Sequence, residues 1–328
     1  MGNSPVLGLD KKQDLKTTAV VKRDRRKGNS LRLSTKPLHI MMIPAVIILF
    51  IYHYVPMFGV VIAFQDFDIM KGIRAFWESE WIGLAHYRRL FSNIDAGRAF
   101  FNTLNIAIQK IVVMNLFPLG VTLLLNEIRK SYVKRTIQTV IYLPHFLSWV
   151  ILAGILRDVL ATDGVINSIL NQVFGLDPIF FLGDKNIFPQ LIVWSHVWKE
   201  FGFSTIVTLA AITGIDPALY EAAIVDGASR LRQTWHITLP GLRPVIVLGL
   251  VLSLGGILNA GFEQVFNLIS APVLETGDII DTLVYRISIT GGQYDLGTAV
   301  GLMKSGVSFF LITISYWLAY KIANYEIF

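Results

Sequence analysis

The sequence has no cysteine among its 328 residues. Disulfide bonds, zinc–thiolate sites, iron–sulfur clusters and thiol nucleophiles are therefore excluded as the basis of its function. Its six histidines lie far apart and none belongs to an HExxH pattern, so we expect no metal site. Charged residues are scarce as well, at 16% of the chain, against about 25% in an average soluble domain.

Hydrophobic residues, in contrast, make up 53% of the chain, and the mean hydropathy of +0.56 is too high for a soluble domain of this length. A transmembrane helix needs about 20 apolar residues, and several stretches reach or nearly reach that length. The expected spans are residues 38–64, 103–125, 136–160, 188–212, 245–266 and 297–320. The sequence therefore predicts an all-α integral membrane protein with six transmembrane helices.

The distribution of basic residues predicts how these spans are oriented. Ten of the 29 Lys and Arg residues lie in the first 36 positions, and basic segments remain on the cytoplasmic side of a membrane. We expect a basic cytoplasmic tail (residues 1–37), a six-helix domain (residues 38–328) and both termini in the cytoplasm. No aromatic residue interleaves with the charges of the tail, which argues against binding to nucleic acid.

The segment between the fourth and fifth expected spans, residues 215–244, carries the signals of two short helices joined by a turn. Asp216 is a good N-cap for a first helix that has Pro217 in its first position. Gly227 can adopt the left-handed conformation that ends a helix. Ser229 can then cap a second short helix, which we expect to end at Pro240. We call this segment the elbow.

The elbow carries more apolar side chains than a solvated loop needs. A short helix can bind a partner protein by laying a few such side chains into a groove. The alternative interpretation is an interfacial loop that packs on its own helical bundle. The side chains concerned are Tyr220, Leu231, Trp235, Ile237 and Leu239.

Seven elbow positions resemble the EAA motif of permeases from ATP-binding-cassette (ABC) importers. They are Glu221, Ala222, Ala223, Gly227, Ile237, Leu239 and Pro240. Other stretches resemble the maltose-type sugar permeases, and within them the oligosaccharide and polysaccharide branch that includes permeases of alginate importers. These stretches are WIGLAHYRRLF (81–91), NTL (102–104), YLPHFLSWV (142–150) and DTLVYRISITGGQYDLGTAVGLMKS (281–305).

This resemblance implies the architecture of a type I ABC importer permease: a multi-pass transport subunit of the bacterial inner (plasma) membrane, and not an enzyme. The implied partners are a second, similar permease, two ATP-binding subunits that bind ATP and magnesium, an extracytoplasmic substrate-binding protein and a carbohydrate substrate, in contact with membrane lipid. This chain itself is expected to hold no cofactor. The elbow would be the coupling helix that contacts the ATPase, through Glu221, Ala222, Ala223, Asp226, Gly227, Ile237, Leu239 and Pro240.

Polar and charged residues inside spans usually face a bundle interior or an aqueous path. Sugars present C–H faces to aromatic rings and hydroxyls to polar groups, so such residues are candidates for a substrate path. The alternative is that they anchor helices or form structural pairs between helices, such as Lys304 with Glu263. The candidates are Trp194, Trp198, Lys199, Glu200, Asn259, Glu263, Gln264 and Lys304.

Lys199 and Glu200 are adjacent in sequence, so they point about 100° apart on a helix. We therefore expect each of them to need another partner. An ion-coupled secondary carrier is a second hypothesis for the whole chain, because these two residues could form a proton or ion relay with Glu263 and Lys304. The sequence GTAVGLMKS (297–305) does not have the spacing of a phosphate-binding loop, so any ATP-derived energy has to come from a partner.

Overall fold

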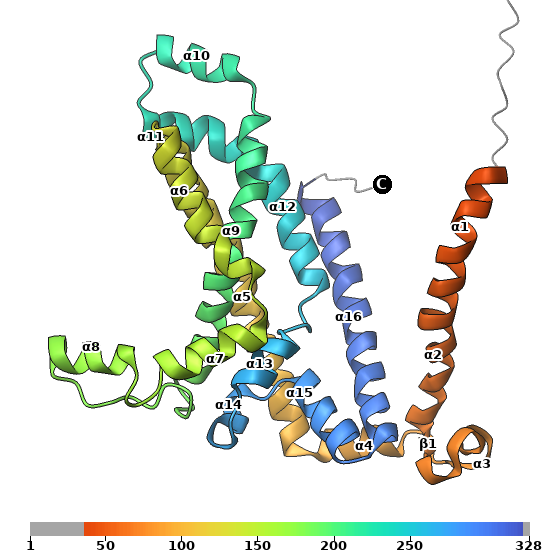
Figure 1. The fold of residues 1–328 in the computed structure, drawn as a ribbon. Helices are drawn as coiled ribbons and strands as arrows, with labels where there is room; N and C mark the ends of the chain where they lie inside the picture. The colour runs from red at the N-terminus through yellow and green to blue at the C-terminus, as the bar shows by residue number, and fades with distance from the viewer. Residues whose placement is uncertain (1–35, 324–328) are drawn as a thin grey trace, which may run out of the picture. The chain divides into compact units, whose positions relative to one another are not determined.

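The computed structural model describes residues 36–323, and the chain divides at Met57 into two units, which we treat separately. The predicted basic tail lies almost wholly outside the described residues. Nearly every element is a helix (Figure 1), so the all-α prediction is confirmed. Four helices are long and apolar enough to cross a membrane, or up to six if two sharply bent helix pairs are each counted as one span.

The first unit consists of one apolar helix. It runs through α1 (Lys36–Leu49), a π-helical turn η1 (Phe50–Tyr54) and α2 (Val55–Met57). The apolar stretch, His39–Phe64, agrees with the first expected span. From His39 to Met57 every side chain is exposed within the chain, as is expected of a helix that meets lipid or another subunit.

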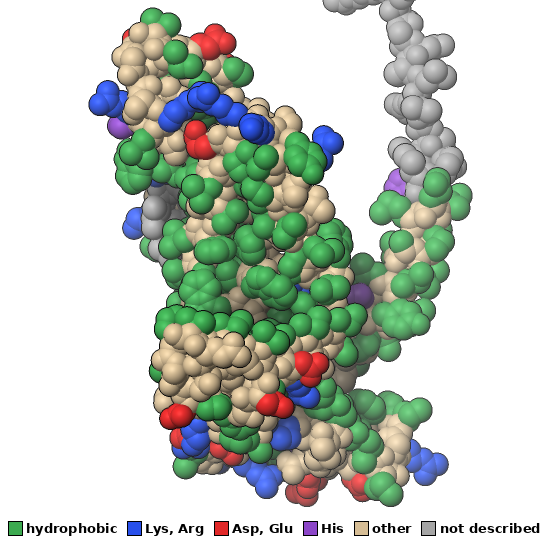
Figure 2. Space-filling model, turned by 60° about the vertical axis from the view of Figure 1, so that its left-hand side comes forward, with side chains coloured by type: hydrophobic (Ala, Val, Ile, Leu, Met, Phe, Trp, Pro, Cys, Tyr) green, Lys and Arg blue, Asp and Glu red, His purple; other side chains and the backbone are tan. Residues whose placement is uncertain are grey.

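The second unit is built around α5 (Ile94–Glu127) and α9 (Phe188–Thr213), which pack along each other. Asn93 caps α5 by accepting hydrogen bonds from the amides of Asp95 and Ala96. The fully buried side chains of Ile106 and Phe188 mark the core between the two helices. Two further long helices, α12 (Leu239–Gly255) and α16 (Tyr294–Ala323), pack against each other. Hydrophobic side chains cover the middle of this unit and charged ones gather toward its two ends (Figure 2).

Short elements connect these helices at the two ends of the unit. We call the end with α10 (Pro217–Val225) the elbow end and the opposite one the far end (Figure 1). At the far end, β1 (Gln65–Asp66) and β2 (Glu80–Trp81) form an antiparallel pair. The other short elements of the far end are η2 (Phe58–Phe64), η3 (Ile69–Arg74), α3 (Ala75–Glu78), α4 (Ala85–Ser92), α8 (Val165–Phe174), η6 (Ala271–Val273), α14 (Leu274–Gly277), α15 (Ile280–Tyr285) and η7 (Arg286–Thr290).

The third expected span is not one straight helix. It consists of α6 (Ser131–Tyr142), η4 (Leu143–Phe146) and α7 (Trp149–Val159), and the chain turns by 104° between η4 and α7. Pro144 interrupts the first helix, since it has no backbone N–H to donate. Ser148 starts the next one, because its side chain accepts a hydrogen bond from the amide of Ile151. The prediction of a continuous span over residues 136–160 is therefore wrong.

The fifth span begins earlier and ends earlier than expected. One helix runs over Arg230–Gly255, through α11 (Arg230–Gln233), the π-helical turn η5 (Thr234–Thr238) and α12. The expectation that a short helix ends at Pro240 is wrong, because the wide turn of η5 accommodates the proline within the first turn of α12. The helix stops at Gly255, and Gly261, with φ of 100°, precedes the separate helix α13 (Phe262–Leu268).

The packing of α6 against α9 generates the first prediction. A Cβ atom added at Gly202 of α9 would collide with the backbone carbonyl of Ile141 on α6, so Gly202→Ala has to push the two helices apart. We expect this change to lower the free energy of unfolding of the purified protein by about 1–3 kcal/mol, as measured by thermal unfolding. Gly120→Ala is the matched control, because that helical glycine on α5 is exposed and has open space around it. Equal stability of the two variants would contradict this packing.

Candidate functional site

The elbow has the local structure that its sequence predicts. Asp216 accepts a hydrogen bond of 2.9 Å from the amide of Ala218 and so caps α10. Gly227 has φ of 72° and turns the chain after α10. Ser229 then caps α11 by accepting a hydrogen bond from the amide of Arg232. The elbow helix α10 is bent by 69° from the axis of α9 and lies across the end of the bundle (Figure 1).

Two hydrogen bonds stabilise the shape of the elbow. The hydroxyls of Tyr220 on α10 and Thr238 on η5 lie 2.9 Å apart, and the buried Gln233 donates to the carbonyl of Ala228. The first contact joins α10 to the helix that becomes α12, and the second holds the turn between α10 and α11. The elbow is therefore connected at both ends to long helices, α9 on one side and α12 on the other.

The surface of the elbow is largely uncovered. No residue of α10 is buried. Leu231 is 77% exposed and Trp235 67%, so the alternative that the elbow packs on its own bundle fails for these two side chains. The other three side chains considered, Tyr220, Ile237 and Leu239, are half-buried within the chain. Of the expected coupling residues, Ala223, Ile237 and Leu239 are half-buried, and the remainder are exposed: Glu221, Ala222, Asp226, Gly227 and Pro240.

Within the bundle, Lys199 and Glu200 pair with each other, which their directions on the helix argued against, and each also has the further partner that was expected, in His145. The Lys199 ammonium donates a 2.9 Å hydrogen bond to one oxygen of Glu200, and His145 Nδ1 lies 2.7 Å from the other. The Lys199 ammonium also donates to the backbone carbonyl of His145 on η4. The long, flexible side chains bend toward His145, so the 100° between their Cβ directions does not keep them apart.

Gln264 lies at a junction of three helices. Its side-chain amide donates to the carbonyl of Ile192 and to the hydroxyl of Ser195, both on α9, at 2.7 and 2.8 Å. Its side-chain oxygen accepts a 2.6 Å hydrogen bond from Lys110 on α5. Sequence reasoning missed Lys110, although a lone lysine inside the apolar run of the second span was a signal for it.

The remaining candidates for the substrate path are spread over several surfaces. The ring of Trp194 meets that of Phe117 edge to face, and Trp198 is partly exposed on the same helix. Asn259 and Glu263 are exposed. Lys304 pairs at 2.5 Å with Asp281 of α15, and not with Glu263 as considered from the sequence.

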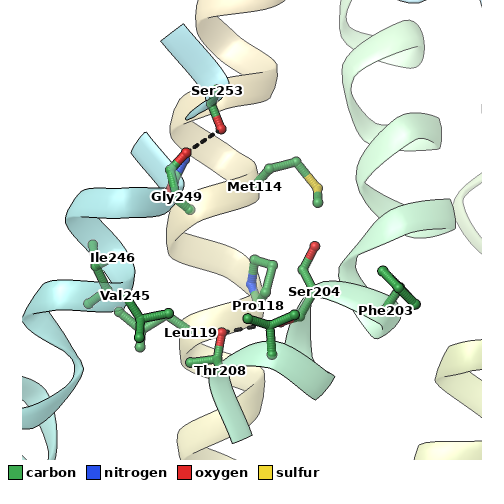
Figure 3. A pocket seen from close by; sticks show the side chains of 12 residues that line it. Met114, Pro118, Leu119, Phe203, Ser204, Thr208, Val245, Ile246, Gly249 and Ser253 are labelled. Atoms are coloured by element: carbon green, nitrogen blue, oxygen red, sulfur yellow. Dashed lines mark hydrogen bonds between the residues drawn. The ribbon is translucent and has the colours of Figure 1, made fainter. Parts of the chain in front are cut away.

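Two cavities lie side by side between α5, α9 and α12, because both are lined by Met114 and Ser253. One has a volume of about 290 Å³ and is lined by Pro118 and Leu119 of α5, Ser204 and Thr208 of α9 and residues 245–253 of α12 (Figure 3). The other has a volume of about 320 Å³, and Lys110, His196 and Asn259 contribute to its wall. One expected path residue, Asn259, therefore shares the wall of this second cavity with the unexpected Lys110.

Charged residues also cluster at the far end. Glu275 forms ion pairs with Lys185 at 2.6 Å and with Arg98 at 3.5 Å. The hydrogen bond from Lys185, and then the charges of both cations, lower the pKa of Glu275. Close by, Arg286 pairs with the buried Asp278 at 2.6 Å. The pairs of Glu275 fasten α14 to α5 and to the loop before α9, and the pair of Arg286 joins η7 to the end of α14.

The family model described as "binding-protein-dependent transport system inner membrane component" matches residues 114–324. The chain belongs to this family. It is therefore a transport subunit of the inner membrane and not an enzyme, as the motifs predicted. The match includes the elbow and most of the helices that line the two cavities.

Two proteins of Bacillus subtilis (strain 168) are similar to this chain over most of their length. The polygalacturonan/rhamnogalacturonan transport system permease protein YteP is 42% identical over 92% of this chain and 94% of its own. Protein LplB is 44% identical over 87% of this chain and 89% of its own.

Solved structures extend the similarity to the fold. A chain in the crystal structure of a bacterial ABC transporter involved in the import of the acidic polysaccharide alginate superposes with a TM-score of 0.81. It is 36% identical, over 88% of this chain and 96% of its own. A second structure of a bacterial alginate ABC transporter, in complex with its alginate pentasaccharide-bound periplasmic protein, matches with a TM-score of 0.80. The predicted type I ABC permease architecture is confirmed, whereas the side of the membrane on which each terminus lies stays a prediction.

The observed partner of Lys304 generates the second prediction. Lys304 and Asp281 have side chains only 18% and 24% exposed, so removal of either leaves a charge poorly solvated. A double-mutant cycle with Lys304→Met and Asp281→Asn should give a coupling energy of about 1–3 kcal/mol in thermal unfolding. The matched cycle with Lys304→Met and Glu263→Gln should give none. Coupling to Glu263 instead would show that the pairing described here is wrong.

Proposed function

We propose that this chain is the permease subunit of an ATP-driven, binding-protein-dependent importer of an acidic oligosaccharide or polysaccharide. The relatives support this substrate class: one is named for polygalacturonan and rhamnogalacturonan, and two solved neighbours belong to importers of alginate. Galacturonan and alginate share a pyranose ring that carries a carboxylate. A chain of such rings is a large, anionic substrate.

The observation that carries the proposed coupling is the uncovered elbow at the end of two long helices. Its exposed apolar side chains, with Leu231 and Trp235 among them, have no partner within the described residues. A groove on an ATPase subunit would cover them, as in other cases where a helix binds in a groove. Glu221 would pair there with a basic or polar group, and Ala222 and Ala223 would permit close approach of the two backbones.

The same geometry supports a mechanism. ATP and magnesium would be bound by two partner ATPases, whose closure would move α10. Because α9 and the helix Arg230–Gly255 leave the two ends of the elbow and both line the cavities, this movement would reshape the cavities. A second permease would complete the path, and the substrate-binding protein would deliver sugar to the far end. The ATPases can favour one conformation of the permease only if their contacts with the elbow differ between the two conformations.

The alternative of an ion-coupled secondary carrier receives less support. Lys199 and Glu200 neutralise each other beside His145, and Lys304 is paired with Asp281. A relay requires groups that can exchange protons or ions with the path. The charges of these residues are instead neutralised by partners within the protein.

The third prediction concerns the turn of the elbow. Gly227→Leu forces a side chain onto a left-handed backbone position, and it should reduce substrate-stimulated ATP hydrolysis and uptake at least tenfold while the complex still assembles. Gly175→Leu is the matched control, because Gly175 also has positive φ and open space but ends α8 at the far end. Both variants bear the same backbone strain. Normal coupling in the Gly227 variant would count against the elbow as the coupling element.

The fourth prediction uses the absence of cysteine from the chain. In the assembled complex, a single cysteine introduced as Ala222→Cys should form a cross-link to an ATPase subunit with a short bifunctional reagent. Ser92→Cys, exposed at the end of α4, provides the matched control and should give no such product. Gel electrophoresis followed by mass spectrometry identifies the products. If the ATPase reacts with position 92 and not with position 222, the proposed docking is refuted.

A further inference from the structure

Lys110 is a buried cation in the wall of the cavity of about 320 Å³. It is 6% exposed and lies on α5 among apolar residues. Its ammonium donates 2.6 Å hydrogen bonds to the carbonyl of Ala260 and to the side-chain oxygen of Gln264. An ammonium has three donors, so one N–H is left over.

Both acceptors of Lys110 are neutral, and this distinguishes it from Lys199 and Lys304, the two other lysines of the long helices that form ion pairs. Lys199 is paired with Glu200, and Lys304 with Asp281. No ion pair among the described residues includes Lys110. A buried charge without a counter-charge is costly, so a group that is retained in this state is a candidate for binding an anion.

The surroundings of Lys110 leave space for such an anion. The cavity of about 320 Å³ that it lines is at the small end of the range for ligand sites, about 300–1,000 Å³. Ser253 and Asn259 offer polar groups on the same wall. Gly261 has no side chain, and a Cβ atom there would lie only 3.1 Å from the Lys110 nitrogen. The approach to the ammonium is therefore kept open.

We propose that Lys110 binds the carboxylate of a uronate residue as the sugar chain passes through this cavity. The inference rests on the proposed function and specifies which residue selects acidic over neutral sugars. The carboxylate supplies the missing counter-charge, and a charge-assisted hydrogen bond in a cavity of low polarity is stronger than one in water. A neutral hexose offers no charge and leaves the ammonium uncompensated.

Direct binding to the purified complex tests this assignment. The probes are radiolabelled pentasaccharides of galacturonate and of alginate, each compared with its carboxyl-reduced form by equilibrium dialysis without the binding protein. Lys110→Gln keeps a hydrogen-bonding side chain but removes the charge, and should weaken binding of the acidic probes about tenfold, the size of one charge-assisted hydrogen bond. Binding of the reduced forms should not change. Lys110→Arg should retain the preference for the acidic forms.

The controls separate this role from a structural one. Gln109→Ala alters the preceding residue of α5, which does not line the cavity, and should leave the acid preference unchanged. Equal losses for acidic and reduced probes in Lys110→Gln, an unchanged preference, or a wild-type complex without preference would each overturn the inference. ATP-dependent import of the acidic probes into proteoliposomes is measured in parallel. If the wild-type and Lys110→Gln complexes import the acidic probes equally well, the inference alone is refuted. If the wild-type complex imports neither acidic probe, the proposed function is refuted as well.

Discussion

The hydrogen bonds that converge on Gln264 join α5, α9 and α13 at one buried point. Inside a membrane no water competes for such groups, so a buried polar side chain is stabilised mainly by partners within the protein. Gln264 satisfies both ends of its amide in this way, and it also fixes the ammonium of Lys110 at the cavity wall. The same group thus contributes to the packing of the helices and to the chemistry of the space between them.

The elbow and the cavities share two helices, and this arrangement connects the two halves of the proposed mechanism. The helix Arg230–Gly255 begins beside the turn at Gly227 and ends next to the cavity wall at Ser253. The helix α9 leaves the elbow on its other side and contributes Ser204 and Thr208 to one cavity and His196 to the other. On each side of the elbow, a single helix therefore connects it to the proposed sugar path, so a movement of the elbow can be transmitted directly.

Local signals predicted the elbow well, because capping and turn formation depend on neighbours in sequence. Asp216, Ser229 and Gly227 all have the roles that their residue types favour. The helical class and the apolar character of the long helices also followed from composition, whereas the positions of their breaks did not. Hydropathy does not distinguish a straight span from one turned by 104°, and Pro240 ends a helix only where no wide turn precedes it.

Contacts between distant segments were beyond prediction from one sequence. Adjacent Lys199 and Glu200 were expected to point apart, but His145, more than 50 positions earlier in the chain, contacts both of them, Glu200 through its imidazole and Lys199 through its backbone carbonyl. The importance of Lys110 depends on Ala260 and Gln264, about 150 positions further along the chain. A lone lysine in an apolar run indicates a polar environment, but only the folded chain shows that its partners carry no charge.

The π-helical turn at Thr234–Thr238 has a consequence for how members of such a family can diverge. A turn of this kind holds about one residue more than an α-helical turn. Loss of that residue would rotate α11 by about 100° around the helix axis relative to Ser253. A single-codon insertion or deletion here would therefore change the direction in which the exposed side chains of α11 face, while the residues of α12 that line the cavities keep their places.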